Sequence, residues 1–424
     1  MTEPALGKEA KTMLAVLTIV NILNFLDRQL VSILIPHIKA DLGLSDSQIG
    51  LLTGAAFAIF FSIAGVPLGW LATQVDRRKL IAAAVAAWSV MTGLCGAASG
   101  FLPLMLARIG VGVGEAGAGP SCYAMISDTF SERSRPAAIS FYATASSLGA
   151  GGGILFGGWA ADALGWRTAF VMAGSLGLLV VPLVWFALVD PLTKFGRRKL
   201  ERSSSAFRSV AVIFKTKTFP PLLVAAIFTA FSGYTLMIWL PSFLVRSFHL
   251  STAQTGGILA PVMVVGGVAG TLTGGLLARK LGSIDLRWWM WLPALTLGAA
   301  VPSAALAILS YQLALTAACL LFTIFASYMF AGPLFAAINT IVYAELRPFA
   351  NSIVLFLQTL VGLSLGPLFT GMASDALMSR FGDDALRYAL VVPIVGMVVA
   401  AVFYLIAART LAVDAAEAGR EVAP

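Results

Sequence analysis

The stretch "GAGGGILFGGWAADAL" at residues 149–164 decides the fold, because a second copy of it occurs far along the chain. Residues 362–377 read "GLSLGPLFTGMASDAL", which is identical at nine of sixteen positions without a gap. A second pair of matching strings, "LSDSQIG" at 44–50 and "LSTAQTG" at 250–256, supports the repeat. The chain is therefore expected to consist of two related halves.

Long apolar runs surround both copies of the repeat. Of the 424 residues, 59% are hydrophobic and 11% are charged, whereas soluble proteins are about 25% charged. Runs longer than about 18 residues are long enough to cross a bilayer as helices. The predicted spans are 13–36, 47–71, 80–99, 101–125, 137–163, 167–189, 219–247, 253–277, 288–310, 312–336, 350–376 and 385–408. We predict an all-α integral membrane protein with twelve transmembrane helices in two six-helix halves.

The positive charges predict how this chain lies in the membrane. Of the 28 Lys and Arg residues, 21 lie at the termini or in the even-numbered connections between spans. Since cytoplasmic loops are enriched in Lys and Arg, we expect both termini to be cytoplasmic, in a plasma or inner membrane. The expected parts are an N-terminal bundle at 1–189, a cytoplasmic linker at 190–218, a C-terminal bundle at 219–408 and a cytoplasmic tail at 409–424. We expect the protein to act as a monomer.

Several classes of function are excluded by the motifs. The net charge of +8 follows membrane topology and does not form a basic patch, so no nucleic-acid partner is expected. The three cysteines lie in three different spans without metal-ligand spacing, which predicts neither a disulfide framework nor a metal site. No strand precedes the glycines of "GVGEAG", so no dinucleotide cofactor is expected. With two histidines and no phosphate-binding loop, we expect neither an enzyme nor an ATP-driven pump.

Four charged residues lie inside the predicted membrane helices. Asp27 and Arg28 are in the middle of "NILNFLDRQLVSILIP" at residues 21–36, and Arg108 and Glu115 are in "RIGVGVGEAGAGP". Residues seven apart lie on one face of a helix, and a rise of about 1.5 Å per residue places Asp27 at a depth between Arg108 and Glu115. Because sequence neighbours on a helix do not face each other, Asp27 and Arg28 each need a partner from elsewhere.

Charges at this depth are expected to pair with one another. Our hypothesis is that Asp27 and Glu115 share Arg108, while Glu115 or the substrate holds Arg28. Protonation of a carboxylate would then release Arg108 for an anionic substrate, which couples proton flow to transport through Asp27, Glu115 and Arg108. The alternative is that the charges only lock two helices together. The second half has uncharged residues at the equivalent positions, so the shared fold does not require these charges.

Aromatic residues in the second half suggest the other wall of a substrate cavity. They lie in "FSGYTLMIWL" and "FASYMFAGP" and include Phe231, Tyr234, Tyr328 and Phe330. An amphipathic anion would place its head on Arg28 or Arg108 and its hydrocarbon on these rings. One alternative is that these rings face lipid or pack inside the protein. For the substrate, the alternative is a small organic anion such as a sugar acid or an aromatic acid. For the function, the alternative is a lipid scramblase.

Three strings together resemble the Spinster branch of the major facilitator superfamily. They are "NFLDRQLVSILIP", "RIGVGVGEAGAGP" followed by "ISDTF", and the loop "GWLATQVDRRK". The resemblance implies the fold of that superfamily and a proton-linked carrier, and animal members of the branch move lysophospholipids or sphingosine phosphate. We predict a proton-coupled secondary active transporter of an amphipathic, anionic, lipid-like substrate, working by alternating access.

The loop at residues 69–79 departs from the pattern of the superfamily. Thr73 and Gln74 stand where that pattern has Asp and Arg. We therefore expect Asp76 and Arg77, with Arg78 beside them, to replace the usual cytoplasmic gate. The alternative is that these cations only anchor the loop on the cytoplasmic side.

Overall fold

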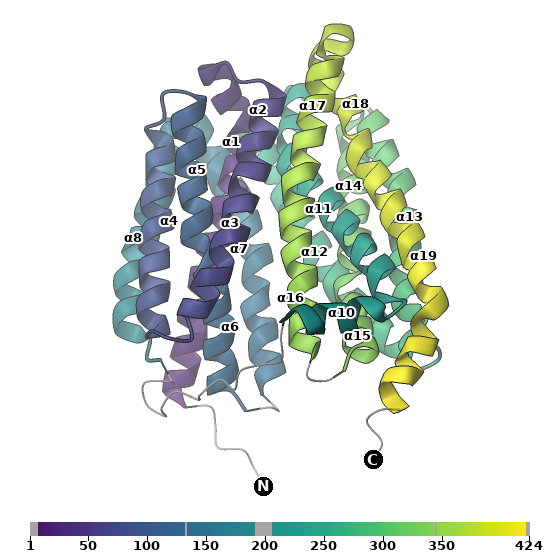
Figure 1. Cartoon of the computed structure of the whole chain (residues 1–424). Helices are drawn as coiled ribbons and strands as arrows, with labels where there is room; N and C mark the ends of the chain where they lie inside the picture. The colour runs from purple at the N-terminus through teal and green to yellow at the C-terminus, as the bar shows by residue number, and fades with distance from the viewer. Residues whose placement is uncertain (1–6, 132–133, 191–205, 344–345, 421–424) are drawn as a thin grey trace. The chain divides into compact units, whose positions relative to one another are not determined.

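The computed structural model describes residues 7–131, 134–190, 206–343 and 346–420, and every regular element in these ranges is helical (Figure 1). The chain divides into two compact units. Unit 1 comprises residues 1–199 together with 249–260, and unit 2 comprises 200–248 together with 261–424. Each unit buries its own apolar core.

Unit 1 is built from membrane-length helices that follow one another with short connections. Its elements are α1 (Lys8–Leu42), α2 (Asp46–Gly50), the π-helical turn η1 (Leu51–Ala55), α3 (Ala56–Leu71), α4 (Arg77–Gly96), α5 (Phe101–Ala116), α6 (Ala118–Thr129), α7 (Arg135–Leu164) and α8 (Trp166–Ala187). Helix α1 packs along α7, and α4 packs along α8 (Figure 1). Gly43 ends α1 with a φ of 62°, a left-handed conformation that favours glycine.

Unit 2 has the same kind of construction. Its elements are α10 (Ala206–Lys215), α11 (Phe219–Phe248), α13 (Trp288–Leu309), α14 (Leu313–Tyr328), α15 (Ala331–Ile341), α16 (Arg347–Leu357), the π-helical turn η3 (Gln358–Leu363), α17 (Ser364–Phe381), the 3₁₀ turn η4 (Gly382–Asp384), α18 (Ala385–Ala389) and α19 (Val391–Arg420). Helix α12 (Thr252–Gly282) begins in unit 1 and continues in unit 2. Within unit 2, α19 packs against both α11 and α13.

The apolar helices agree with the predicted spans. Eleven stretches of the described chain are long and apolar enough to cross a membrane. The first ten each overlap one predicted span, and the last, Phe349–Ala418, contains the final two. The turn η4 separates the predicted spans 350–376 and 385–408. The predicted all-helical membrane fold is therefore confirmed.

Two helices extend into segments that were expected to lie outside the bundles. Helix α19 continues to Arg420, past the predicted start of the tail at 409. Helix α10 occupies part of the predicted linker at 190–218, of which residues 191–205 lie outside the described residues. The reason is local: "AFRSVAVIFK" places apolar residues on one helical face, and "LAVDAAEAGR" is rich in residues that favour helix.

The glycines of the repeat allow α7 to contact the backbone of α1. A Cβ atom added to Gly149 would lie 2.4 Å from the carbonyl oxygen of Ile22, and one added to Gly153 would lie 2.4 Å from that of Leu26. Both glycines are on one face of α7, four residues apart. Small residues at this spacing allow membrane helices to pack closely where apolar burial alone gives no driving force.

The second copy of the repeat makes the same contact in unit 2. A Cβ atom added to Gly362 would lie 2.9 Å from the backbone nitrogen of Phe231, and one added to Gly366 would lie 2.6 Å from the carbonyl oxygen of Phe231. These two glycines align with Gly149 and Gly153 in the repeat. The repeated glycines thus perform the same packing within each unit.

A pair of adjacent glycines tests this contact. Gly153→Ala is expected to lower the free energy of unfolding by about 1–3 kcal/mol, since overpacking forces backbone or side chains to shift. Gly152→Ala is the matched control, because no heavy atom lies within 4 Å of its added Cβ, and it is expected to stabilise the helix by up to about 1 kcal/mol. Thermal unfolding in detergent measures both, and equal midpoints for the two variants would contradict the close contact.

Candidate functional site

The four intramembrane charges of unit 1 lie on two helices, α1 and α5. Asp27, Arg108 and Glu115 are buried, with exposed fractions of 4%, 3% and 2%. The side chain of Arg28 is 16% exposed. Glu115 lies in the last turn of α5, which ends at Ala116 where Gly117 interrupts the predicted span. The carboxylates of Asp27 and Glu115 and the guanidinium of Arg108 are therefore almost completely buried.

The structure forms two ion pairs from these groups. The Nε atom of Arg28 donates to Oε2 of Glu115 at 2.7 Å, and Nη1 of Arg108 lies 3.8 Å from Oδ2 of Asp27. The sequence hypothesis had Asp27 and Glu115 sharing Arg108, with Arg28 held by Glu115 or by the substrate. Among the described residues, however, Asp27 is the carboxylate paired with Arg108, and Glu115 is paired with Arg28. The two neighbours on α1 thus have different partners on α5.

Close packing by glycine brings α5 against α3 and α4. A Cβ atom added to Gly112 would lie 2.8 Å from the carbonyl oxygen of Phe57 on α3, and one added to Gly114 would lie 2.7 Å from the backbone nitrogen of Trp88 on α4. Both glycines thus let a neighbouring helix approach the backbone of α5. They place α5 directly against the two helices that line the charged cluster.

Several polar atoms of the cluster are buried without a hydrogen bond from the protein. Within the described residues these are Oδ1 of Asp27, Oε1 of Glu115, and Nε and Nη1 of Arg108. A buried polar atom without a partner is energetically unfavourable. Each carboxylate therefore has one oxygen that is free to accept a proton, and Arg108 has two N–H groups that are free to donate to an anion.

Side chains that the sequence analysis did not identify complete the cluster. Thr92 on α4 donates from Oγ1 to Oδ2 of Asp27 at 2.9 Å. The guanidinium carbon of Arg28 lies 5.5 Å from the ring centre of Phe25, 4.9 Å from that of Phe57 and 5.0 Å from that of Phe61. A threonine or a phenylalanine in an apolar helix has no distinguishing pattern, so no sequence signal marks these residues.

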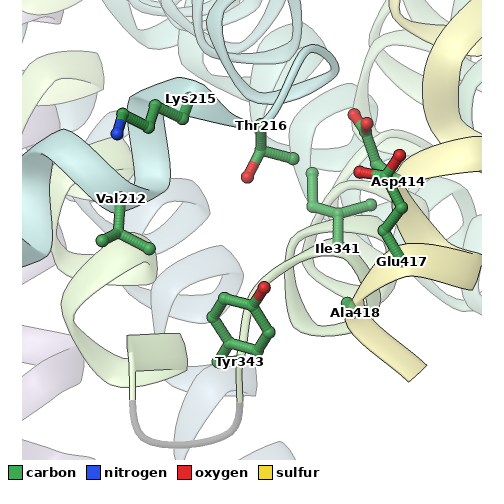
Figure 2. Close-up of a pocket in the computed structure, with 8 residues that line it drawn as sticks. All are labelled: Val212, Lys215, Thr216, Ile341, Tyr343, Asp414, Glu417 and Ala418. Atoms are coloured by element: carbon green, nitrogen blue, oxygen red, sulfur yellow. The ribbon is translucent and has the colours of Figure 1, made fainter. Parts of the chain in front are cut away.

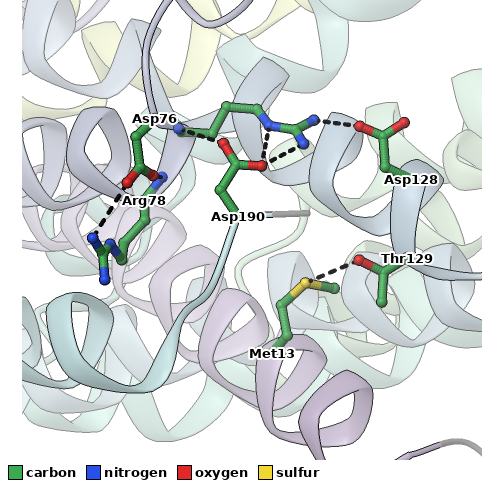
Figure 3. Close-up of polar contacts among 7 residues, drawn as sticks. Met13, Asp76, Arg78, Asp128, Thr129 and Asp190 are labelled. Carbon is green, nitrogen blue, oxygen red and sulfur yellow. Dashed lines mark hydrogen bonds and ion pairs between the residues drawn. The ribbon is translucent and has the colours of Figure 1, made fainter. Parts of the chain in front are cut away.

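The loop residues Asp76, Arg77 and Arg78 lie at the start of α4 and have separate partners. Asp76 caps α4 by accepting from the backbone N–H of Arg78 at 2.9 Å, and it also pairs with the guanidinium of Arg78 at 3.3 Å. Arg77 instead pairs with Asp128 at 2.7 Å and with Asp190 at 2.6 Å. The expected partnership of Asp76 with Arg77 is therefore replaced by two others (Figure 3).

The carboxylate of Asp190 accepts hydrogen bonds from both the backbone and the side chain of Arg77. It accepts from the backbone N–H of Arg77 at 2.8 Å and from Nε at 3.0 Å. Both residues are buried, at 2% exposed each. This contact joins the first turn of α4 to the chain three residues after the end of α8, and the pair with Asp128 adds the end of α6.

The four aromatic residues predicted to contact substrate occupy different environments in unit 2. Phe231 is 7% exposed and packs against Phe228 and Phe369. Tyr234 and Phe330 are partly exposed. Tyr328 is 42% exposed and helps to line a cavity of about 30 Å³, together with Gly233, Leu236, Met237, Leu240, Met263, Ile324 and Ser327.

Unit 2 also has a larger polar cavity that the sequence analysis did not anticipate. Its volume is about 190 Å³, and its lining residues are Val212, Lys215, Thr216, Ile341, Tyr343, Asp414, Glu417 and Ala418. Figure 2 shows the carboxylates of Asp414 and Glu417 beside each other on α19. Asp414 accepts from the backbone N–H of Thr218 at 2.7 Å, which caps the start of α11. Among the described residues, no group of acidic, His and Cys side chains is suited to hold a metal ion.

The family model described as Major Facilitator Superfamily matches residues 17–367. The chain belongs to the Major Facilitator Superfamily. The division of one span into two helices occurs in both units: α5 ends at Ala116 and is followed by α6, and α14 ends at Tyr328 and is followed by α15. The predicted superfamily fold with its two related halves is thereby confirmed.

Two similar proteins are described as transporters of different kinds. An "MFS-type efflux pump" of Mycolicibacterium smegmatis is 32% identical over 417 residues, covering 97% of this chain and 96% of the relative. A "Probable L-galactonate transporter" of Escherichia coli is 26% identical over 266 residues, covering 60% of this chain and 58% of the relative.

A solved structure supports the predicted branch of the superfamily. It is the crystal structure of a bacterial homolog to the human lysosomal transporter Spinster, in an inward-facing and unoccupied conformation. It is 29% identical in sequence and matches with a TM-score of 0.85, covering 98% of this chain and 99% of that chain. The resemblance to the Spinster branch is confirmed.

Proposed function

We propose that this superfamily member is a proton-coupled secondary active transporter of an amphipathic, anionic, lipid-like substrate. The observation that carries the proposal is the buried cluster of Asp27, Arg28, Arg108 and Glu115. Ionisable groups inside membrane helices mark pathways for substrates, ions or protons more often than they serve packing. The absence of any such charge at the equivalent positions of the second half supports a role in transport and not in the shared fold.

The geometry supports a specific role for Asp27. Its contact with Arg108 is long, at 3.8 Å, and its Oδ1 atom has no hydrogen bond among the described residues. A proton on that oxygen removes the charge that holds Arg108. The guanidinium then has N–H groups to donate to a phosphate or carboxylate, and such charge-assisted hydrogen bonds are strong in a poorly solvated site. Proton binding and substrate binding are thereby linked.

Arg28 supports the lipid-like part of the proposal. Its guanidinium pairs with Glu115 and stands beside three phenylalanine rings, so a positive group and an apolar surface occur together. An amphipathic anion places its head on the first and its hydrocarbon on the second. We further propose that both termini are cytoplasmic, because the basic residues cluster in the termini and the even-numbered connections.

A second candidate is a proton symporter of a small organic anion, which the similarity to the L-galactonate transporter favours. Purified protein in proteoliposomes with an imposed pH gradient separates the two. We expect accumulation of radiolabelled sphingosine phosphate that is lost when a protonophore collapses the gradient, with no accumulation of L-galactonate. Gradient-driven accumulation of L-galactonate alone would establish the second candidate and reject the first. Equal movement of the lipid with and without the gradient would indicate a scramblase.

A further inference from the structure

Phe57 lies between the two ion pairs of the charged cluster. It belongs to α3 and is 1% exposed. Its ring centre is 4.9 Å from the guanidinium carbon of Arg28 and 5.2 Å from that of Arg108. One aromatic ring therefore contacts two cations, and each cation belongs to a different ion pair.

The two cations depend on this ring to different degrees. Arg28 has a short hydrogen bond to Glu115 and contacts two further rings, those of Phe25 and Phe61. Arg108 has only the 3.8 Å contact with Asp27, and Phe57 is its one aromatic neighbour among the described residues. Because the face of an aromatic ring attracts cations, and more strongly where water is excluded, Phe57 attracts Arg108 in addition to Asp27.

The ring itself is held in place. A Cβ atom added to Gly112 of α5 would lie 2.8 Å from the carbonyl oxygen of Phe57 and 3.4 Å from its Cδ2 atom, so α5 packs directly against this residue. On the other side the ring stacks on Phe61, with ring centres 5.6 Å apart and an interplanar angle of 18°. The position of the ring is therefore set by the packing of α3 and α5, and does not depend on whether Asp27 is charged.

We propose that Phe57 is a positioning residue for the proton step. It holds Arg108 in place when Asp27 takes a proton, and it draws Arg108 away from Asp27 when the carboxylate is charged. The ring thus weakens the ion pair and makes Asp27 easier to protonate than it would be beside an unrestrained guanidinium. This inference rests on the proposed protonation of Asp27.

Infrared titration of the purified protein tests the inference without any substrate. The carbonyl band of the protonated carboxyl group is followed as the pH is lowered. In Phe57→Leu, Arg108 is expected to move toward Asp27, and the midpoint of the band should shift to lower pH by about 0.5–1 unit. Phe57→Tyr keeps a ring and should restore the parent midpoint. Phe57→Met fills similar space without a ring, and it replaces the leucine variant if that variant does not fold.

Phe25→Leu is the matched control, since Phe25 contacts the guanidinium of Arg28 and, among the described residues, makes no such contact with that of Arg108. Its midpoint should equal that of the parent. Since all 20 Asp and Glu residues give such a band when protonated, the spectra of Asp27→Asn are subtracted from those of the parent, and the component missing in the variant belongs to Asp27. If no component is missing, the proposed proton step itself is wrong. If the component is missing but Phe57→Leu titrates like the parent, or Phe25→Leu shifts equally, the role of Phe57 is overturned and the proton step stands.

Discussion

Asp27→Asn is expected to abolish accumulation of substrate against a gradient while leaving exchange of substrate across the membrane intact. A gradient of two pH units sustains at most about a hundredfold accumulation if one proton is coupled to one substrate, because each unit corresponds to a factor of ten. Asparagine has a similar shape but takes no proton, so the ratio of internal to external substrate should approach one. Proteoliposomes measure both quantities, with labelled sphingosine phosphate as the probe.

The direction of the effect follows from the sign of the gradient. In symport an acidic exterior drives uptake, and in antiport an acidic interior drives it, so both gradients are imposed. Asp41→Asn is the control, because Asp41 is also on α1 but its side chain is 46% exposed and pairs with Arg167. The control should accumulate substrate like the parent protein. Undiminished accumulation by Asp27→Asn in either gradient would show that coupling lies elsewhere.

Breaking the pair of Arg28 and Glu115 is expected to have the second large effect. The side chain of Glu115 is 0% exposed, and its partner Arg28 is 16% exposed. Removing one member of a buried ion pair costs about 3–5 kcal/mol, because the other charge is left without compensation. Glu115→Gln should therefore lower the thermal midpoint in detergent markedly, with the partial exposure of Arg28 placing the effect near the lower limit.

The double variant distinguishes charge imbalance from lost packing. When both members are replaced by apolar residues of similar volume, as in Arg28→Met with Glu115→Leu, stability is often regained. We expect the double variant to unfold at a higher temperature than Glu115→Gln, but to accumulate no substrate, since Arg28 is proposed to meet the anionic head. A double variant as unstable as the single one would mean that the pair contributes specific structure and not only charge balance.

Most of the fold could be predicted from the sequence because its signals are local or repeated. The apolar runs gave the membrane helices, and the repeat gave the register in which Gly149 and Gly153 correspond to Gly362 and Gly366. The same glycines make the same close contacts in each unit. The extent of α19 was not predicted because helix-favouring residues continue past the apolar run, and α10 was not predicted because its apolar residues occupy only one helical face.

The membership of the charged cluster was predictable, but the sequence left the partner of Arg28 open and gave Arg108 a second partner, Glu115, with which it forms no ion pair among the described residues. Charges inside apolar helices have few partners other than one another, so α1 and α5 were expected to meet. Which guanidinium meets which carboxylate depends on the rotation of α1 against α5 and on side-chain rotamers, and counting depth along a helix determines neither. The partner of Arg77 could not be predicted either. Asp190 is 113 residues away in sequence, and no pattern around either residue indicates the other.

The ion pair between Arg77 and Asp190 has a mechanical consequence. Asp190 is the last described residue before the segment that leads into the second half of the chain. It accepts a hydrogen bond from the backbone of Arg77 in the first turn of α4, and Arg77 also pairs with Asp128 at the end of α6. Moving the chain after α8 away from α4 would therefore require breaking an ion pair that also involves α6.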